Sequence, residues 1–220
     1  MKTDSNALSP TIASHGLPFG ASLFTVFLCI LFGANAAAIK ISLTGLGIFT
    51  SAGLRFGLAA VTLLLWAWLT DKPLAVNRLQ LRKLVLLALI FYIQLSLFYS
   101  GLSRTTASHG TLIANILPFI VMILAHFFIP GDSINLKKIL GLVLGFGGVI
   151  TLFIDRATLT SIGLQGDLLV LLAVFIWGGH VVYIKKITAG FHPVQITLYP
   201  MLMAAPLFLV SGYLWDEHMF

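Results

Sequence analysis

Long apolar segments alternate with short polar breaks along almost the whole chain. Because a bilayer core about 30 Å thick is crossed by roughly 20 apolar residues in a helix, each long segment predicts a membrane-spanning helix. The short breaks predict antiparallel neighbours, so we expect an all-α, polytopic transmembrane helix bundle. Seven segments fit this length: 18–37, 47–70, 83–102, 108–129, 136–154, 167–185 and 194–214.

The first and sixth of these segments resemble each other. Residues 21–40 align without gaps with residues 166–185 at an offset of 145 positions, which places Asn35 on His180. Five spans separate the starts of the two copies, and an odd number of spans inverts the second copy relative to the membrane. Inverted repeats are typical of secondary transporters, whose two halves can exchange inward-facing and outward-facing shapes.

Composition and charge agree with a membrane location. The chain is 59% hydrophobic and 9% charged, whereas about 25% of residues are charged in a typical soluble domain. If the N-terminus is cytoplasmic, nine Lys and Arg residues lie on the inner side and three on the outer side. This bias predicts a multi-pass protein of the cytoplasmic membrane with its N-terminus in the cytoplasm. The basic residues are scattered, so the net charge of +6 does not indicate a nucleic-acid partner.

The spans group into two units. Residues 1–17 are predicted to form a mobile cytoplasmic leader, 18–154 a first five-span unit, and 155–220 the start of a second unit with two spans. Residues 19–36 also resemble the apolar core and cleavage site of a signal peptide, but the internal copy favours a retained span. A complete second unit needs about 75 further residues by this span length. We therefore expect a truncated gene product, a partial chain or a chain that needs a partner.

Four stretches resemble a known family. They read FGANAAAIK, GIFTSAGLRFGLAAVTLLL, FYSGLSRTTASHGTLIANILPFIVMILAHFFI and INLKKILGLVLGFGGVITLF. Over residues 20–214 their order and spacing resemble the EamA-type permeases of the drug/metabolite transporter superfamily. The resemblance implies a complete fold of ten spans. Two features depart from the family pattern, because Asp132 stands where a glutamate is common and only seven spans are predicted.

The expected function is secondary transport of a small organic metabolite by alternating access. The alternative is a non-transporting or defective membrane fragment or subunit that needs a partner to complete its fold. No enzymatic activity is expected, because the sequence has no HExxH or GxSxG motif and no paired carboxylates within a span. The expected partners are the lipid bilayer and a small-molecule solute, with no metal and no cofactor.

Polar and aromatic side chains within the spans are the candidates for a substrate pathway. Arg55 is interpreted either as a ligand for a carboxylate or phosphate or as a structural arginine that binds helix-end carbonyls or reaches the outer surface. His180 either responds to protons or forms a hydrogen bond with a neighbouring helix. Because they are repeat equivalents, Asn35 and His180 are expected near opposite mouths of one pathway. The complete set is Asn35, Arg55, Gln94, Tyr99, Asn115, Pro118, Trp177 and His180.

Helix shape and packing supply the remaining predictions. Pro118 has no backbone N–H, so it predicts a kink beside Asn115, whose amide either lines a cavity or bonds to another helix. Trp177 either stacks on an organic solute or serves only in packing. One small-residue stripe contains a GxxxG step and predicts close helix packing, within the chain or in a homodimer. Its residues are Gly141, Gly145 and Gly148.

Overall fold

The protein is described by a computed structural model that covers residues 19–130, 134–153 and 163–216. Within these ranges all regular structure is helical, which confirms the predicted all-α class. The chain divides into two compact units, residues 1–35 and 36–220. In its described part the first unit is one apolar helix, which continues into the second unit. The predicted leader and Asp132 lie outside the described residues.

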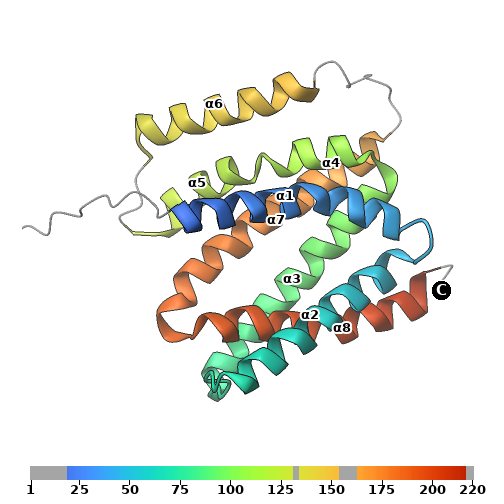
Figure 1. The fold of residues 1–220 in the computed structure, drawn as a ribbon, viewed down its shortest axis with the longest axis vertical. Helices are drawn as coiled ribbons and strands as arrows, with labels where there is room; N and C mark the ends of the chain where they lie inside the picture. Colours follow the sequence, from blue (N-terminus) through green and yellow to red (C-terminus); the bar gives the residue numbers. More distant parts are fainter. Residues whose placement is uncertain (1–18, 131–133, 154–162, 217–220) are drawn as a thin grey trace, which may run out of the picture. The chain divides into compact units, whose positions relative to one another are not determined.

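The helices follow the predicted apolar segments. Six spans within the described residues are long and apolar enough to cross a membrane, with α4 and α5 counted as one. The fifth predicted segment forms α6, an α-helix of 18 residues. The elements in Figure 1 are α1 (Phe19–Ser42), α2 (Ile48–Leu69), α3 (Arg78–Arg104), α4 (Ala107–Ala114), α5 (Leu117–Phe128), α6 (Leu136–Phe153), α7 (Leu164–Ile187), η1 (Thr188–Gly190) and α8 (Pro193–Trp215).

Local capping explains where α3 and α8 begin. The side chain of Asn77 accepts a hydrogen bond from the Gln80 N–H at 2.8 Å, and the Gln80 side chain accepts one from the Asn77 N–H at 2.9 Å. A similar cap starts α8, where His192 Nδ1 accepts from the Val194 N–H at 3.3 Å and the Gln195 side chain accepts from the His192 N–H at 2.9 Å. Such pairs satisfy backbone amides that have no partner inside the helix. The polar breaks between spans therefore contain the signals that start the next helix.

The structure places the break in the fourth predicted span just before Pro118. Helix α4 ends at Ala114, α5 begins at Leu117, and Pro118 occupies the first turn of α5. A proline is tolerated in the first turn because the amide that it lacks would have no intrahelical partner there. Asn115 is exposed, and its Nδ2 donates to the carbonyl of Thr111 on its own helix at 2.8 Å.

Two antiparallel helix pairs form the core of the second unit. Helix α2 packs along α8, and α3 packs along α7 (Figure 1). The α3–α8 contact joins the two pairs. The largest side chains buried in this core include Tyr99, Leu102 and Phe208. This arrangement leaves much of the outer apolar surface exposed, as expected for helices that face lipid.

Helix boundaries follow the offset of the predicted repeat. When the bounds of α1 are shifted by 145 positions, they become Leu164 and Ile187, which are the bounds of α7. The same shift carries the first residue of α2 onto Pro193, the first residue of α8. Helices α2 and α8 are thus the second helices of the two predicted units, and they lie antiparallel.

Candidate functional site

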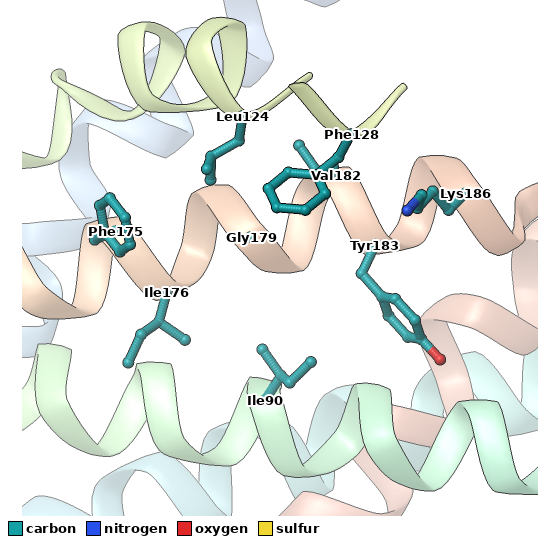
Figure 2. Close-up of a pocket in the computed structure, with 9 residues that line it drawn as sticks. All are labelled: Ile90, Leu124, Phe128, Phe175, Ile176, Gly179, Val182, Tyr183 and Lys186. Atoms are coloured by element: carbon teal, nitrogen blue, oxygen red, sulfur yellow. The ribbon is translucent and has the colours of Figure 1, made fainter. Parts of the chain in front are cut away.

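An apolar cavity with a volume of about 420 Å³ lies between α3, α5 and α7. Small-molecule sites typically measure about 300–1,000 Å³, so this space suits a small organic compound. Figure 2 shows Leu124 and Phe128 reaching from α5, Ile90 from α3, and the other side chains along α7. The lining residues are Ile90, Leu124, Phe128, Phe175, Ile176, Gly179, Val182, Tyr183 and Lys186.

A glycine keeps the middle of the cavity open. Gly179 lies at the centre of the α7 wall in Figure 2. No described heavy atom outside its own helix backbone lies within 4 Å of the point where its Cβ would be. A larger residue at this position would therefore fill the cavity without displacing another helix.

The polar groups of the cavity wall lie at one end. Lys186 is the one charged residue among the described lining residues, and Tyr183 lies one turn before it on α7. The Lys186 Nζ atom is 5.5 Å from the centroid of the Phe128 ring, a cation–π distance. Lys186 is exposed, so the charge remains hydrated while the ring holds it near the cavity. The cavity is therefore apolar along its length and positive at one end.

The α3–α7 interface beside this cavity buries two polar atoms that have no partner. Gln94 is 4% exposed and His180 is 6% exposed. Among the described residues, neither Gln94 Oε1 nor His180 Nε2 has a hydrogen-bond partner. An unsatisfied buried polar atom costs about 1–3 kcal/mol, so this section of the interface is destabilised. A hydroxyl, an amine or water that entered here would relieve that cost.

Aromatic contacts place Gln94 and His180 in the same section of the interface. The His180 ring is 5.9 Å from the ring of Phe91, and the Trp177 ring is 6.4 Å from the ring of Phe98, between centroids. Gln94 lies on α3 between these two aromatic residues. The structure thus brings three predicted pathway residues together: Gln94, Trp177 and His180.

The other two central candidates form a separate pair. Arg55 Nη1 donates to the Tyr99 hydroxyl at 3.4 Å, and its Cζ atom is 5.8 Å from the centroid of the Phe56 ring. Tyr99 is only 2% exposed. This contact joins α2 to α3, and both the ligand and the structural interpretation of Arg55 stay predictions.

Three pathway candidates remain. Asn35 is the last residue of the first unit. Asn115 and Pro118 are exposed at the break between α4 and α5. A role of Asn35, Asn115 or Pro118 in a substrate pathway stays a prediction.

A close approach of α3 and α7 occurs at glycines that the sequence analysis did not select. A Cβ on Gly101 of α3 would lie 2.8 Å from the carbonyl oxygen of Gly166 on α7. In contrast, no described atom of another helix lies within 4 Å of the Cβ position of Gly141 or Gly145. The predicted contact of the stripe formed by Gly141, Gly145 and Gly148 with another helix or a second copy stays a prediction.

A network of charged groups at one end of the bundle was also missed. Lys40 Nζ donates to three carbonyls at the end of α3, those of Leu102, Ser103 and Thr105, at 2.7, 3.2 and 2.6 Å. The Asp167 carboxylate on α7 accepts from the Thr105 hydroxyl and lies 3.2 Å from His109 Nδ1. The hydrophobic pattern placed these residues near the ends of spans, but it could not indicate which of their side chains are in contact.

A second carboxylate joins α8 to α2 at the same end. The N-cap residue of α2 is Gly47, which has no side chain to accept a bond from the first free amides. Asp216 supplies the missing acceptor: it accepts from the Phe49 N–H at 3.3 Å and from the Thr50 N–H and hydroxyl at 2.8 Å each. The repeat offset of 145 pairs Asp216 with Asp71, a signal present in the sequence that could have marked this residue.

Six membrane-length spans and a solute-sized cavity define a polytopic α-helical membrane protein with a pocket among its spans. The chain belongs to the EamA-like transporter family, whose model matches residues 19–154 and 164–219. It is therefore a multi-pass membrane protein of a transporter family, and the resemblance of its spans to that family is confirmed.

Curated relatives carry the same general description. The uncharacterized transporter YoaV of Bacillus subtilis is 22% identical over 189 residues, which are 85% of this chain and 64% of that protein. The uncharacterized transporter YyaM of the same organism is 27% identical over 194 residues, which are 84% of this chain and 60% of that protein. An uncharacterized transporter of Archaeoglobus fulgidus is 27% identical over 196 residues, or 84% of this chain and 65% of that protein. The chain thus spans less than two thirds of the length of these relatives.

A solved structure shares the fold. One crystal structure superposes with a TM-score of 0.73 and covers 91% of this chain and 70% of its own. The two sequences are 17% identical, so this likeness concerns the fold alone.

Proposed function

We propose that this protein is a secondary transporter that moves a small organic metabolite across the cytoplasmic membrane by alternating access. The observation that carries the proposal is the relation between α2 and α8, the second helices of the predicted units 18–154 and 155–220. They begin 145 positions apart, lie antiparallel and pack along one another. Two inverted copies of one helix arrangement can close a shared pathway at either end in turn.

The two ends of the α2–α8 pair differ in the hydrogen bonds of their repeat-equivalent aspartates, and this difference supports the proposal. Asp216 accepts three hydrogen bonds from the start of α2. Its repeat equivalent, Asp71, is exposed, and its carboxylate accepts no hydrogen bond from the described residues. With a cytoplasmic N-terminus, the Asp216 contact lies on the outer side. In the proposed cycle this outer contact opens when the start of α8 closes against the end of α2, and it forms again on return.

In this cycle the cavity between α3, α5 and α7 holds the solute. The Lys186 end of the cavity is cytoplasmic in the predicted orientation. Gln94 and His180 offer unpartnered polar atoms beside it, and Trp177 offers an aromatic face. Arg55 supports the site by joining α2 to α3 through Tyr99.

Accessibility of the cavity from the two sides of the membrane tests alternating access without knowledge of the solute. The single native cysteine is replaced by Cys29→Ser, and Gly179→Cys places a thiol in the cavity. A membrane-impermeant maleimide is then applied to right-side-out and inside-out vesicles. We expect the thiol to react from both sides. Labelling from the cytoplasmic side alone would show a fixed pocket and contradict the proposal.

A cross-link sharpens this experiment. Thr50→Cys and Asp216→Cys, joined by oxidation, should hold the outer end shut, because their native side chains already bond at 2.8 Å. The cross-link is expected to abolish labelling of residue 179 from outside and to leave labelling from inside intact, and reduction should restore both. Leu144→Cys, at a side chain that is 75% exposed on α6, serves as the lipid-facing control that reacts from neither side.

A membrane subunit that does not transport alone is the second candidate. For such a subunit, residue 179 would react from one side alone in isolated chains and from both sides only after a partner chain is co-reconstituted.

A further inference from the structure

We propose that the solute of the cavity between α3, α5 and α7 is an amphipathic anion, with an apolar and preferably aromatic body and one carboxylate or phosphate group. This inference rests on the proposed function, since it names the substrate class for the same cavity. Lys186 is the residue that selects the charge.

The wall of the cavity selects an apolar body. Seven of its nine described lining residues have no polar side-chain atom, and the other two, Tyr183 and Lys186, lie together at one end. A hydroxylated body such as a sugar would leave its hydroxyls unpaired along this wall, at a cost of about 1–3 kcal/mol for each buried group. Phe128 and Phe175 lie toward opposite ends of the wall in Figure 2 and can stack on an aromatic ring.

The charge at the end of the cavity selects an anion. Lys186 is a cation, and no carboxylate is present among the described lining residues to neutralise it or to hold a cationic solute. Its ammonium group lies over the Phe128 ring, 5.5 Å from the centroid, so the charge is held at the edge of the apolar space. Attraction between charges is stronger beside low-dielectric walls than in bulk water. An ammonium group is a compact positive charge with three rotatable donors, so it can bind either a carboxylate or a phosphate.

The arrangement therefore matches a molecule with a ring at one end and an anionic group at the other. Its ring would lie beside Gly179, where no side chain fills the space, and its anionic group would lie beside Lys186. In the predicted orientation the charged group would face the cytoplasm, where water also solvates it.

Three probes with the same body test this specificity: 4-phenylbutyrate, 4-phenylbutanol and 4-phenylbutylammonium. Their binding to the full chain is measured by titration calorimetry in nanodiscs of uncharged phosphatidylcholine. We expect the acid to bind about fivefold more tightly than the alcohol, the factor for a partly exposed ion pair, and the ammonium compound to bind most weakly. Equal affinity for the acid and the alcohol would overturn the proposal.

Neighbouring lysines provide the matched control. Lys186→Gln is expected to reduce the affinity for the acid to that for the alcohol, whereas Lys186→Arg retains the preference. Lys185→Gln removes the same charge from the adjacent position, outside the cavity lining, and should leave the preference unchanged. Equal losses in the Lys185 and Lys186 variants would assign the effect to general surface charge and contradict the proposal.

Filling the cavity locates the binding site. Gly179→Leu places a side chain in open space and should abolish binding of all three probes while the protein still unfolds cooperatively on heating. Unchanged binding would place the probes elsewhere and overturn the proposal. Displacement of the acid by phosphatidylglycerol added to the nanodiscs would also overturn it, because an anionic lipid would then be the occupant.

Failure here can be distinguished from failure of the proposed function. If residue 179 reacts from both sides of the membrane but the acid shows no preference, alternating access stands and the substrate class is wrong. If residue 179 reacts from one side alone, the proposed function itself fails, whatever the probes show.

Discussion

The two ends of the α2–α8 and α3–α7 pairs are held together by different chemistry. At the end where α2 begins, which we call the Asp216 end, three of the contacts involve a charged group. Lys40 donates to three carbonyls at the end of α3, Asp167 accepts from Thr105, and Asp216 accepts from Thr50.

At the opposite end, which we call the Lys186 end, two side chains of α8 make neutral hydrogen bonds to the segment after α2. Gln195 Nε2 donates to the carbonyl of Ala75 at 2.8 Å, and the Tyr199 hydroxyl donates to the carbonyl of Leu74 at 2.7 Å. The start of α8 is capped by its own residues, unlike that of α2.

The difference indicates which end is more firmly closed. A hydrogen bond to a charged group contributes about 1.5–3 kcal/mol, against about 0.5–1.5 kcal/mol for a neutral bond. Two carboxylates of the second predicted unit hold elements of the first unit at the Asp216 end. At the Lys186 end, Gln195 and Tyr199 of α8 make neutral bonds to the segment after α2. An end held by neutral bonds can open with less loss of stability, which fits the position of the cavity charge at the Lys186 end.

The largest effect is expected from the close contact of α3 and α7 at the Asp216 end. Gly101→Leu would force a Cβ to 2.8 Å from Gly166, and overpacking of a tight contact costs at least about 1–3 kcal/mol. We expect a strongly reduced yield of folded protein and a large drop in the unfolding temperature in detergent. Gly141→Leu, at a glycine with open space, should change neither. Similar losses for both variants would show that the α3–α7 contact is not tight.

Lys40 is expected to give the next largest effect. Lys40→Met keeps the length of the side chain but leaves the carbonyls of Leu102 and Thr105, both buried residues, without this donor. The expected loss is about 1–3 kcal/mol in the free energy of unfolding. Lys83→Met removes an exposed lysine from the second turn of α3 and should change stability by less than about 0.5 kcal/mol. If Lys40→Met lowers the free energy of unfolding no more than Lys83→Met does, the bonds from Lys40 to the end of α3 do not stabilise the fold.

Several features of the fold could be predicted from the sequence because they depend on one helix at a time. Span length follows from the count of apolar residues, and the helix break follows from the missing amide of Pro118. The offset between Asn35 and His180 gave the register of the repeat, and the bounds of α1 and α7 follow the same register.

The meeting of side chains from different helices could not be predicted in this way. Gln94 and Tyr99 lie five positions apart on α3 and were assigned to one polar set, yet their side chains face different neighbours. Tyr99 meets Arg55 of α2, and Gln94 lies in the section that packs on α7. The rotation of each helix about its axis decides such contacts, and the almost uniformly apolar composition of these spans carries little information about it.

Two buried glutamines allow the stability contribution of a side chain at the Lys186 end to be compared with that of one at the centre of the bundle. Gln195 is 5% exposed and bonds to Ala75, so Gln195→Leu should lower the free energy of unfolding by about 1–2 kcal/mol. Gln94 is 4% exposed with an unpartnered oxygen, so Gln94→Leu should leave stability unchanged or raise it. Chemical denaturation of the two variants measures both. A loss for Gln94→Leu as large as that for Gln195→Leu would show that Gln94 has a partner, such as a bound water.

The smallest effect, and the most direct test of the comparison, concerns the two repeat-equivalent carboxylates. Asp216→Asn keeps the size of the side chain but removes the negative charge that three donors and the start of α2 favour. We expect a loss of about 1 kcal/mol in the free energy of unfolding, because an amide oxygen still accepts a weaker bond.

Asp71→Asn is the matched control, because its backbone φ of 49° tolerates asparagine as well as aspartate. The Asp71 carboxylate accepts nothing from the described residues, so the expected change lies within about 0.5 kcal/mol. Equal losses at the two positions would mean that both carboxylates stabilise the fold to the same extent. The different hydrogen bonds at the Asp216 end and the Lys186 end would then not indicate which end opens. A loss at Asp216 alone would mean that the same residue in the two units stabilises one end in this arrangement. That is the asymmetry that an inverted repeat must have whenever its pathway is closed on one side.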